Sequence, residues 1–352
     1  MNIMRYSRNK INIAGKLLVE KNPANLLQWS EAMTVIDNWR EDHLPVLANL
    51  IVQVNALFEA GDVRFAFSSQ RLKRMTSIIA KLNHNPGMCL GGLQDIGGAR
   101  FVFEDTQSLF QASKLVSEAN FDGFELDRHP YDYVQSPKSS GYRSIHFVFK
   151  YHSEDESLDG KRVELQLRTK LQHNWATAVE TAELISKSAL KAGVGNVAWQ
   201  EFFQLVSAVF AKKENLPVSE DFIQYTERDY CVAYARMDSE HHFVDQLRAL
   251  VGTISVVESQ TFERGYVVLL VDTQQKNVHY RHFAETDKAT ANELYSELER
   301  NIQGTDSAAL LVSVIDMQEL LSAYPSYFMN AKEFIDSLAE FVGKCKLEGY
   351  IA

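Results

Sequence analysis

The stretch Arg162–Thr169, RVELQLRT, alternates strictly between polar and apolar residues. Such alternation is typical of a β-strand with one face on a hydrophobic core, so we expect Val163, Leu165 and Leu167 to face that core. The opposite face then carries Arg162, Glu164, Gln166 and Arg168. That polar face is either the solvated side of a sheet or the lining of a cleft. Which of the two it is determines whether these residues can form a ligand-binding site.

Composition bounds the class of protein. The chain has 352 residues, enough for two domains, with 45% hydrophobic and 23% charged residues, as in soluble globular proteins. We recognise neither an apolar run long enough to span a bilayer nor a secretory signal. We therefore expect a cytoplasmic protein with no membrane partner, in which Cys89, Cys231 and Cys345 are reduced.

Charge is distributed unevenly along the chain. The net charge is −10, but residues 1–175 carry 21 Lys+Arg against 20 Asp+Glu, whereas residues 176–352 carry 15 against 26. The two halves thus sum to +1 and −11. A nucleotide or RNA site is expected in the first half, while the acidic half is either a solvated surface or a segment that repels or mimics such a ligand.

Local patterns predict a mixed α+β fold. We expect helices over 30–42, 43–60, 71–82, 106–119, 171–190 and 198–213, and strands over 99–103, 143–150 and 162–168. After a boundary near 215–235 we expect helices near 239–258 and 287–302, a hairpin over 265–283, a strand near 308–316 and a closing helix. The prediction is a mixed β-sheet flanked by helices, followed by a second, small α/β domain.

The segment 71–82, RLKRMTSIIAKL, combines an apolar stripe with a row of cations. At helical spacing the apolar side holds Leu72, Met75, Ile79 and Leu82. The neighbouring side holds Arg71, Arg74, Ser77 and Lys81. This row is either a solvated basic face or a clamp for a polyphosphate, because guanidinium groups bind phosphate oxygens through two parallel hydrogen bonds.

A second carboxylate could act together with Glu164. Asp95 stands just before Gly97-Gly98 and Arg100, at the entry of a predicted strand. By itself, Asp95 is typical of a turn. If the two carboxylates meet in a cleft, they could hold Mg²⁺, which prefers oxygen ligands and completes its shell with water and substrate phosphates.

The loop before the strand over 143–150 has the parts of a nucleotide site. In Gln135–Phe149, QSPKSSGYRSIHFVF, Tyr142 lies between the cations Lys138 and Arg143. The cations can neutralise phosphates, and the tyrosine ring offers a flat face for a base. The alternative is a structural tyrosine at a strand entrance.

Read in order, these segments resemble the RelA/SpoT-type alarmone synthetase domain, over about residues 1–210. The matching motifs are Arg71-x-Lys73-x-x-x-Ser77-Ile78-x-x-Lys81, Asp95-Ile96-x-Gly98-x-Arg100, Asp132-Tyr133-Val134-x-x-Pro137-Lys138-x-x-Gly141-Tyr142-Arg143-Ser144-Ile145-His146, Glu164-Leu165-Gln166-Leu167-Arg168-Thr169 and Trp175-Ala176. The family has a nucleotidyltransferase-like mixed sheet and transfers the β,γ-pyrophosphate of ATP to a nucleotide 3′-hydroxyl, releasing AMP.

The resemblance implies a role for each matching residue. It implies ATP binding by Arg71, Lys73, Arg74, Ser77, Lys81 and Arg100. It implies Mg²⁺ binding by Asp95 and Glu164, with Glu164 able to take the proton of the attacking hydroxyl, and stacking of Tyr142 on the acceptor base. It implies acceptor binding by Lys138, Tyr142, Arg143, His146 and Gln166. Asp95, Tyr142 and Glu164 would be the catalytic set.

The chain departs from the family pattern on the acceptor side. Ser139-Ser140 replaces an Asn-containing segment, and TAVETAE after Trp175-Ala176 lacks the usual histidine. These departures leave the acceptor open. No His-Asp dipeptide occurs, so we expect the hydrolase of the long bifunctional members to be absent.

The acidic second half resembles the C-terminal region of CapRel-type proteins, fused toxin–antitoxin members of the toxic small alarmone synthetase group. The match is the Tyr-x-x-Tyr element of Tyr324 and Tyr327. It implies a toxin domain over 1–215 and a regulatory, antitoxin domain over 216–352, like a zinc finger that has lost its metal. His279 and His282 indeed have no cysteine partners at metal-ligand spacing. In that group the region covers the nucleotide site until a phage capsid protein binds it, and the enzyme then modifies the 3′-CCA end of tRNA.

Three functions therefore stay open. The first is a self-inhibited pyrophosphokinase acting on tRNA in antiphage defence, and the second is a synthetase of guanosine or adenosine alarmones. The third is a nucleotide-sensing protein without catalysis. A tRNA acceptor needs additional cations near the pocket, for which the candidates are Arg74, Arg128, Lys161, Arg162 and Lys170.

Overall fold

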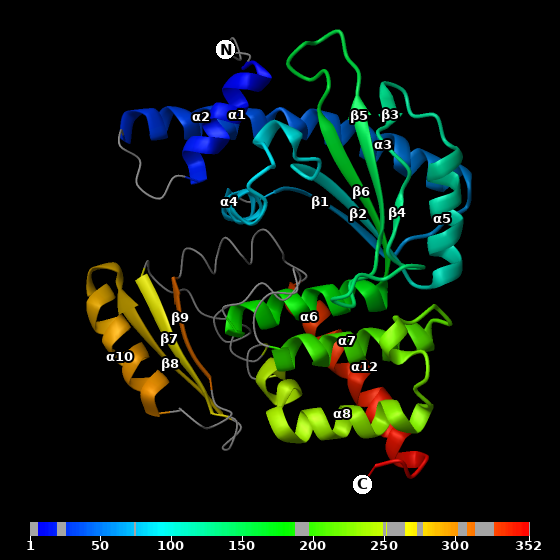
Figure 1. The fold of residues 1–352 in the computed structure, drawn as a ribbon, viewed down its shortest axis with the longest axis vertical. Helices are drawn as coiled ribbons and strands as arrows, with labels where there is room; N and C mark the ends of the chain where they lie inside the picture. Colours follow the sequence, from blue (N-terminus) through cyan, green and yellow to red (C-terminus); the bar gives the residue numbers. More distant parts are fainter. Residues whose placement is uncertain are drawn as a thin grey trace. The chain divides into compact units, whose positions relative to one another are not determined.

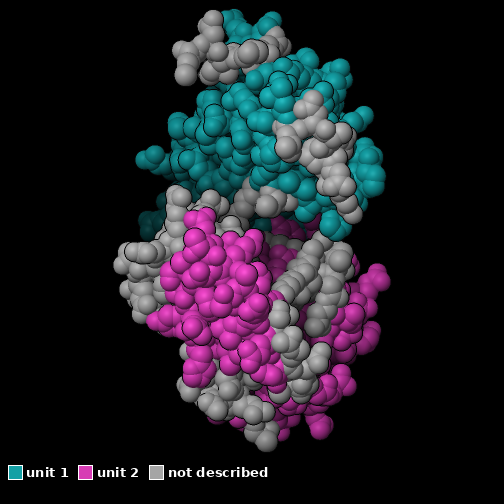
Figure 2. Space-filling model, turned by 90° about the vertical axis from the view of Figure 1, so that its left-hand side faces the viewer, with its two compact units in different colours: residues 1–133, 144–170 teal, residues 134–143, 171–352 magenta. Residues whose placement is uncertain are grey.

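The computed structural model describes residues 6–19, 26–73, 75–186, 197–248, 251, 265–272, 277–301, 308–313 and 327–351. The chain divides into two compact units, 1–133 with 144–170 and 134–143 with 171–352 (Figure 2). The helices that follow residue 170 thus cluster with the C-terminal segment, not with the sheet. The functional division at 215/216 stays a prediction.

The first unit is built on one mixed sheet (Figure 1). Its strands are β1 (Phe67–Leu72), β2 (Gly97–Phe103), β3 (Phe124–Leu126), β4 (Tyr131–Asp132), β5 (Ile145–Tyr151) and β6 (Arg162–Thr169). They lie in the order β1-β2-β6-β5-β3, with β4 also paired to β5. The β2–β6 pair is parallel and the others are antiparallel, which confirms the predicted fold class.

Two helices cover the apolar face of this sheet. The helices of the unit are α1 (Arg8–Val19), α2 (Leu26–Glu41), α3 (His43–Ala60), α4 (Met75–His84), η1 (Leu90–Gly92) and α5 (Thr106–Glu118). Both α3 and α5 contact β2 and β6, and Phe58 of α3 packs edge-on against Phe101 of β2, with 5.2 Å between ring centroids. The Asp105 carboxylate caps α5 by accepting from the Ser108 amide. The opposite face of the sheet is therefore left for the polar side chains.

A second core of the first unit joins α1, α2, α4 and η1. Its buried members are Ile11, Ala14, Leu18, Ala32, Val35, Ile36, Trp39, Ile78, Leu82, Leu90, Leu93 and Ile96. Ile96 directly precedes β2, so this core fixes the end of the sheet at which Asp95 stands.

The second unit combines a helical core with a small sheet. Its elements are α6 (Lys170–Ser186), α7 (Val197–Lys213), η3 (Glu220–Phe222), α8 (Glu227–His241), β7 (Gly265–Asp272), β8 (Asn277–Ala284), η4 (Glu285–Asp287), α10 (Lys288–Asn301), β9 (Ala308–Ser313) and α12 (Tyr327–Leu347). Phe202 of α7 packs against Phe243. The neighbouring Phe203 packs against Phe334 of α12. The antiparallel sheet β8-β7-β9 contacts α10.

Two predicted elements near the N-terminus are placed differently. The helix expected over 71–82 begins at Met75, because Arg71 and Leu72 extend β1, an antiparallel strand on β2. The buried stripe of α4 accordingly includes Ile78 and not Leu72. The helix expected from residue 30 begins at Leu26, whereas the expected end of α3 before Gly61 is confirmed.

The helical stretch Leu27–Ala60 is long and apolar enough to cross a membrane by length and composition, contrary to our expectation of no such run. Part of the stretch is buried in the fold, because Leu47, Leu50 and Val54 of α3 are fully buried and α3 contacts β1, β2 and β6. Leu27, Leu44 and Val52 of the same stretch are exposed. A core helix of a globular protein has the same composition.

The prediction of three reduced cysteines is wrong for two of them. Cys231 of α8 and Cys345 of α12 form a disulfide, while Cys89 is free. The bonded residues are 3% and 0% exposed, so the bond is shielded from exchange with thiols in solution. They are 114 residues apart in sequence, a separation at which no local motif signals a pairing.

We expect one free thiol per chain in the unreduced, unfolded protein and three after reduction. Closing so long a loop stabilises the folded chain by at most about 4–5 kcal/mol, so Cys231→Ser should lower the free energy of unfolding by a part of this amount. Thiol titration with urea unfolding checks both points. Cys89→Ser is the matched control, and three free thiols before reduction would contradict the pairing.

Candidate active site

Strand β6 carries the predicted division between an apolar and a polar face. Val163, Leu165 and Leu167 are fully buried. The Glu164 side chain on the other face is only 14% exposed, and Arg168 is 2% exposed. The polar face of β6 is thus shielded from solvent at Glu164 and Arg168, while the Arg162 side chain is 24% exposed, so this face is not a freely solvated side of the sheet.

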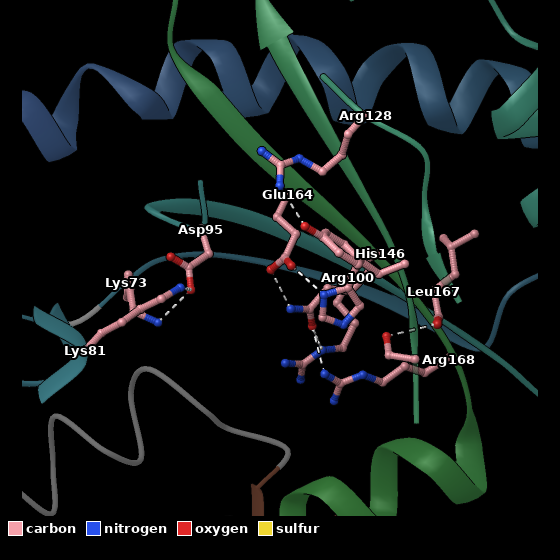
Figure 3. A network of polar contacts seen from close by, with 12 residues as sticks. Lys73, Lys81, Asp95, Arg100, Arg128, His146, Glu164, Leu167 and Arg168 are labelled. Carbon is pink, nitrogen blue, oxygen red and sulfur yellow. Dashed lines mark hydrogen bonds and ion pairs between the residues drawn. The ribbon is translucent and has the colours of Figure 1, made fainter. Parts of the chain in front are cut away.

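A hydrogen-bonded network fills this polar face (Figure 3). Glu164 Oε1 lies 2.5 Å from His146 Nδ1, and Glu164 Oε2 accepts from Gln166 Nε2 at 2.8 Å. The side-chain oxygen of Gln166 in turn accepts from Arg100 Nε at 3.3 Å and from Arg168 Nη2 at 2.9 Å. Strand register causes this grouping, since Gln166 stands opposite Arg100 on β2 and His146 on β5.

The environment of Glu164 keeps its carboxyl ionised. Burial by itself raises the pKa, but the His146 ring, the Gln166 amide and the Lys81 ammonium outweigh burial and lower the pKa of Glu164 to about 2. A carboxylate with so low a pKa is suited to binding a cation. It is a weak general base, because proton transfer is most efficient when the pKa lies near the working pH.

Asp95 is the centre of a second charged group. Lys73 Nζ and Lys81 Nζ each lie 2.9 Å from Asp95 Oδ2, and Figure 3 shows both lysines reaching the same carboxylate. The Lys73 amide donates to the Ile96 carbonyl at 2.7 Å, which ties the end of β1 to the start of β2. Burial raises the pKa of Asp95, but the two lysines outweigh it and lower the pKa below the ordinary value.

Of the two predicted metal ligands, Glu164 is on β6 and Asp95 lies just before the neighbouring strand β2. Gly98 of β2 pairs with Glu164 of β6, Asp95 lies just before β2, and Lys81 acts electrostatically on both carboxyls. Asp95 Oδ1 is buried and has no hydrogen-bond partner, as expected of an oxygen that a cation would complete. Among the described residues no group of three or more His, Cys, Asp or Glu could hold a metal, so Mg²⁺ bound here would need water and substrate phosphates as further ligands.

The other predicted ATP-binding residues are distributed around this end of the sheet. Arg71 is on β1 opposite Gly98, so its side chain shares the polar face of the sheet with Glu164. Ser77 is exposed on α4. Arg74 lies outside the described residues.

The predicted acceptor tyrosine belongs to the second unit and is buried there. Tyr142 is 7% exposed, its ring centroid lies 6.5 Å from that of Trp175, and Lys138 Nζ lies 5.2 Å from its ring centroid. Gly141 has φ +88°, and a Cβ there would lie 2.9 Å from Ser207 Cβ, so only glycine fits this turn. Lys138 and Trp175 thus both lie beside the ring on which a base was predicted to stack.

Arg143 is placed differently from the prediction that it neutralises phosphates. It is 4% exposed and donates to the Val134 carbonyl at 2.9 Å, the Pro217 carbonyl at 2.8 Å and Ser207 Oγ at 3.3 Å. Burial lowers its pKa to about 10, which still leaves it charged. Its guanidinium holds the loop 134–143 to the rest of the second unit.

Most cations proposed for an RNA backbone already have carboxylate partners. The ion pairs are Lys161–Asp42 at 3.0 Å, Arg162–Asp127 at 3.0 Å, Arg128–Asp127 at 3.3 Å and Lys170–Glu104 at 3.9 Å. Lys161 is also 9% exposed. These pairs reduce the positive charge that the described part of the first unit can offer to phosphates.

Sequence reasoning did not include Arg168 among the site residues. The alternation of β6 put Arg168 on the polar face, and the structure brings it to the Gln166 oxygen that Arg100 also contacts.

A prominent cavity of about 620 Å³ lies in the second unit, against α7, α8 and α12. None of the predicted site residues lines it.

The low pKa of Glu164 has a consequence for stability. A carboxyl whose pKa is lower in the folded chain than in the unfolded chain stabilises the fold above the unfolded value, and this contribution is lost as pH falls toward the folded value. We expect the free energy of unfolding of wild type, relative to Glu164→Gln, to decrease between about pH 4.5 and about pH 2. Urea unfolding over a pH series measures this difference.

The chain offers an exposed control for that experiment. Glu125 also pairs with a histidine, His152, at 3.0 Å, but its side chain is 67% exposed, so Glu125→Gln should leave the pH dependence almost unchanged. A difference between wild type and Glu164→Gln that stays constant over the whole range would contradict the proposed environment of Glu164.

Comparisons with known proteins support the family resemblance over part of the chain. The family model described as the region found in RelA / SpoT proteins matches residues 70–189, from β1 to the end of α6. A GTP pyrophosphokinase of Bacillus subtilis is 32% identical over 131 residues, 35% of this chain and 60% of that protein. A GTP pyrophosphokinase of Photobacterium angustum is 26% identical over 184 residues, 52% of this chain and 23% of that protein.

Two further similarities complete this picture. An uncharacterized protein of Mycobacterium bovis is 30% identical over 112 residues, 32% of this chain and 37% of that protein. Among solved structures, the small alarmone synthetase 1 from Bacillus subtilis is 22% identical with a TM-score of 0.43, covering 51% of this chain and 92% of that chain. The chain spans less than two thirds of the length of these curated relatives. Residues 70–189 are similar to the region found in RelA / SpoT proteins.

Proposed function

We propose that the chain is an ATP pyrophosphokinase, which transfers the β,γ-pyrophosphate of ATP to the 3′-hydroxyl of a nucleotide. One observation carries the proposal: the enclosed polar face of the sheet holds Glu164 beside the group of Asp95, Lys73 and Lys81. Carboxylates next to lysines form a site for a polyphosphate together with a divalent cation. The RelA/SpoT-type region supports the same reaction.

The lysines would bind the donor phosphates. Lys73 and Lys81 now share Asp95 Oδ2, and a triphosphate offers them stronger, multiply charged partners. Arg100, already directed at Gln166, would add a guanidinium on the same face. Binding of ATP thus exchanges contacts within the protein for contacts to phosphate.

Asp95 and Glu164 are the residues that would hold Mg²⁺. When bound, Mg²⁺ neutralises phosphate oxygens and orients them for transfer. Release of the lysines toward ATP would free Asp95 Oδ2 as well as the unpartnered Oδ1. The two carboxylates therefore fit the ion best when the donor is present.

In the reaction, the acceptor 3′-oxygen forms a bond to the β-phosphorus of ATP. The bond between that phosphorus and the oxygen bridging to the α-phosphate breaks, AMP leaves, and the acceptor hydroxyl loses its proton. Glu164 is close to full ionisation at neutral pH, so it would accept this proton only after the His146 hydrogen bond is released. Positioning and charge neutralisation supply most of the rate enhancement in such a transfer.

We propose two classes of acceptor, and the ion pairs of the first unit favour one of them. The ion pairs of Arg128, Lys161 and Arg162 leave little charge for an RNA backbone and favour a small guanine or adenine nucleotide. The relatives named GTP pyrophosphokinase point the same way. The 3′-CCA end of tRNA is the second acceptor, proposed from the CapRel-type resemblance. With these substrates the activity would be cytoplasmic.

Transfer of label from ATP tests the reaction and identifies the acceptor. Wild type is incubated with Mg²⁺ and ATP labelled at the γ-phosphorus, together with GDP, GTP, ADP or bulk tRNA, and products are separated. We expect label in one acceptor class. Glu164→Ala should reduce the rate at least about 100-fold, because it removes charge stabilisation that acts in the transition state.

The matched control is Glu125→Ala, which removes an exposed carboxylate of the same unit and should retain the wild-type rate. Absence of label in every acceptor, both from wild type and from the unrestrained variant described next, would contradict the proposal. A nucleotide-sensing protein without catalysis would then be the better explanation.

We also propose, from the same resemblance, that the acidic C-terminal region restrains the enzyme in antiphage defence until a phage capsid protein binds it. Tyr324 and the side chain of Tyr327 lie outside the described residues. Phe203, Phe210 and Phe334 form one core of α7 and α12. Removing the C-terminal region would expose that core, so point substitutions are the appropriate test.

We expect Tyr324→Ala with Tyr327→Ala to raise label transfer about tenfold over wild type, the ratio expected when a restrained, inactive state holds nine tenths of the wild-type molecules. Addition of a purified capsid protein should raise the wild-type rate and leave the double variant unchanged. Tyr350→Ala, a tyrosine near the C-terminus, is the control. Equal rates for wild type and double variant, with and without capsid protein, would contradict the restraint.

A further inference from the structure

The cavity against α7, α8 and α12 has no part in the proposed reaction. Its volume of about 620 Å³ lies within the range of roughly 300–1,000 Å³ that is usual for small-molecule sites. The three helices pack together in the second unit (Figure 1). All lining residues come from 209–216, 227–231 and 337–350, so the cavity lies within one unit and is large enough for a small ligand.

The apolar part of the lining is largely aromatic. It includes Phe210 of α7, Tyr230 of α8 and Phe341 of α12, of which the first two are buried. Phe210 packs edge-on against Phe334, with 5.7 Å between ring centroids, and the Tyr230 hydroxyl donates to the Phe222 carbonyl at 3.0 Å. These contacts hold the rings in place. Fixed aromatic walls favour a flat aromatic ligand, because rings attract one another when stacked or edge-on.

Three side-chain links join the helices around the cavity. They are the disulfide Cys231–Cys345 between α8 and α12, the ion pair Lys213–Glu340 at 2.6 Å between α7 and α12, and the ion pair Lys344–Glu227 at 3.1 Å between α12 and α8. All six residues line the cavity. The covalent link in particular holds two walls together before any ligand arrives, so binding requires little ordering of the protein.

The charged residues of the lining leave one cation in excess. They are Lys212, Lys213, Lys344, Glu227 and Glu340, and all of them are exposed. Both glutamates pair with lysines, whereas Lys212 has no carboxylate partner within the part of the chain that the structure describes. This excess stands in the half of the chain that carries 15 Lys+Arg against 26 Asp+Glu. The exposed edge of the cavity therefore complements a ligand with a single negative charge.

The turn that ends α7 also favours an anion at this edge. Asn215 has φ +56°, and its amide donates to the Lys212 carbonyl at 3.2 Å. The Leu216 amide donates to the Ala211 carbonyl at 2.8 Å. Such a turn satisfies carbonyl oxygens at the end of a helix. These two oxygens already accept hydrogen bonds, so the lysine side chains remain as the groups that α7 offers to a ligand here.

We propose that this cavity binds a small aromatic molecule with one anionic group, with its rings among Phe210, Tyr230 and Phe341 and its charge beside Lys212. None of the residues predicted to bind ATP, Mg²⁺ or the acceptor lines the cavity, so the inference does not depend on the proposed function. A nucleoside triphosphate carries several negative charges, which a single excess cation does not balance. The cavity is therefore a second site for a ligand of a different class.

The dye 8-anilino-1-naphthalenesulfonate tests the site in the full chain, because it combines aromatic rings with one sulfonate and fluoresces when its rings leave water. We expect one dye molecule per chain, with a Kd on the order of 10–100 μM for a ligand of this size. Ser337 lines the cavity, so Ser337→Trp should weaken binding at least about tenfold, since the indole and the dye would occupy the same space. Ala339→Trp is the matched control, because it adds the same side chain at an exposed position of α12 outside the lining.

A second pair of variants tests the charge of the ligand. Lys212→Gln should weaken binding of the dye about two- to fivefold, the range expected for an exposed ion pair. N-phenyl-1-naphthylamine has the same rings without the sulfonate, and Lys212→Gln should bind it as wild type does. Lys346→Gln is the control, because it removes an exposed lysine of α12 that does not line the cavity, and it should bind both dyes as wild type does.

Thermal unfolding identifies the variants that fold, and Ser337→Leu, a smaller filling substitution, replaces Ser337→Trp if the indole prevents folding. Unchanged dye binding to the folded Ser337 variant, an equal loss in Ala339→Trp, or displacement of the dye by ATP with Mg²⁺ would overturn the site. Equal effects of Lys212→Gln on both dyes, or an effect on neither, would overturn the anionic character of the ligand. Failure of label transfer would contradict the proposed function and leave these binding results unaffected.

Discussion

The parallel pairing of β2 with β6 is the constraint on which the rest of the first unit depends. It sets Gly98 opposite Glu164 and Arg100 opposite Gln166, while Ala99 and Phe101 meet Leu165 and Leu167 on the covered face. A shift of one residue in β6 would turn Glu164 toward the core formed with α3 and α5. The apolar face thus fixes the register, and the register fixes the polar site.

The charges on the polar face balance one another in the chain itself. Two ammonium groups meet one carboxylate at Asp95, and Glu164 has a histidine and an amide as partners. Because these groups are partly buried, leaving any of them unpaired would cost free energy. A triphosphate with its cation brings charges of both signs, so it can replace these pairs without leaving a charge uncompensated. The same pairs that stabilise this face would also select for the proposed ligand.

Features that depend on residues close in sequence were mostly predicted, whereas features that depend on distant parts of the chain were not. The alternation of β6 and the end of α3 at Gly61 are local, and both were predicted. Residues 71–72 carry a helical pattern but pair with β2, and that pairing outweighs the local preference. The partners of Arg143 at 207 and 217 and the disulfide between Cys231 and Cys345 depend on distant parts of the chain. The helix α8 was missed although its capping box of Thr226 and Asp229 is a local signal.

The loop 134–143 links the proposed acceptor chemistry to the C-terminal region. It belongs to the second unit, where Arg143 binds Pro217 and Ser207 and Gly141 packs against α7. The same helix shares its core with α12 through Phe203, Phe210 and Phe334. Tyr142 therefore belongs to the same unit as the C-terminal helices, whereas Glu164 belongs to the unit of the sheet. A partner of the C-terminal helices would therefore bind the unit that contains Tyr142, which is how the proposed restraint would reach the predicted acceptor tyrosine.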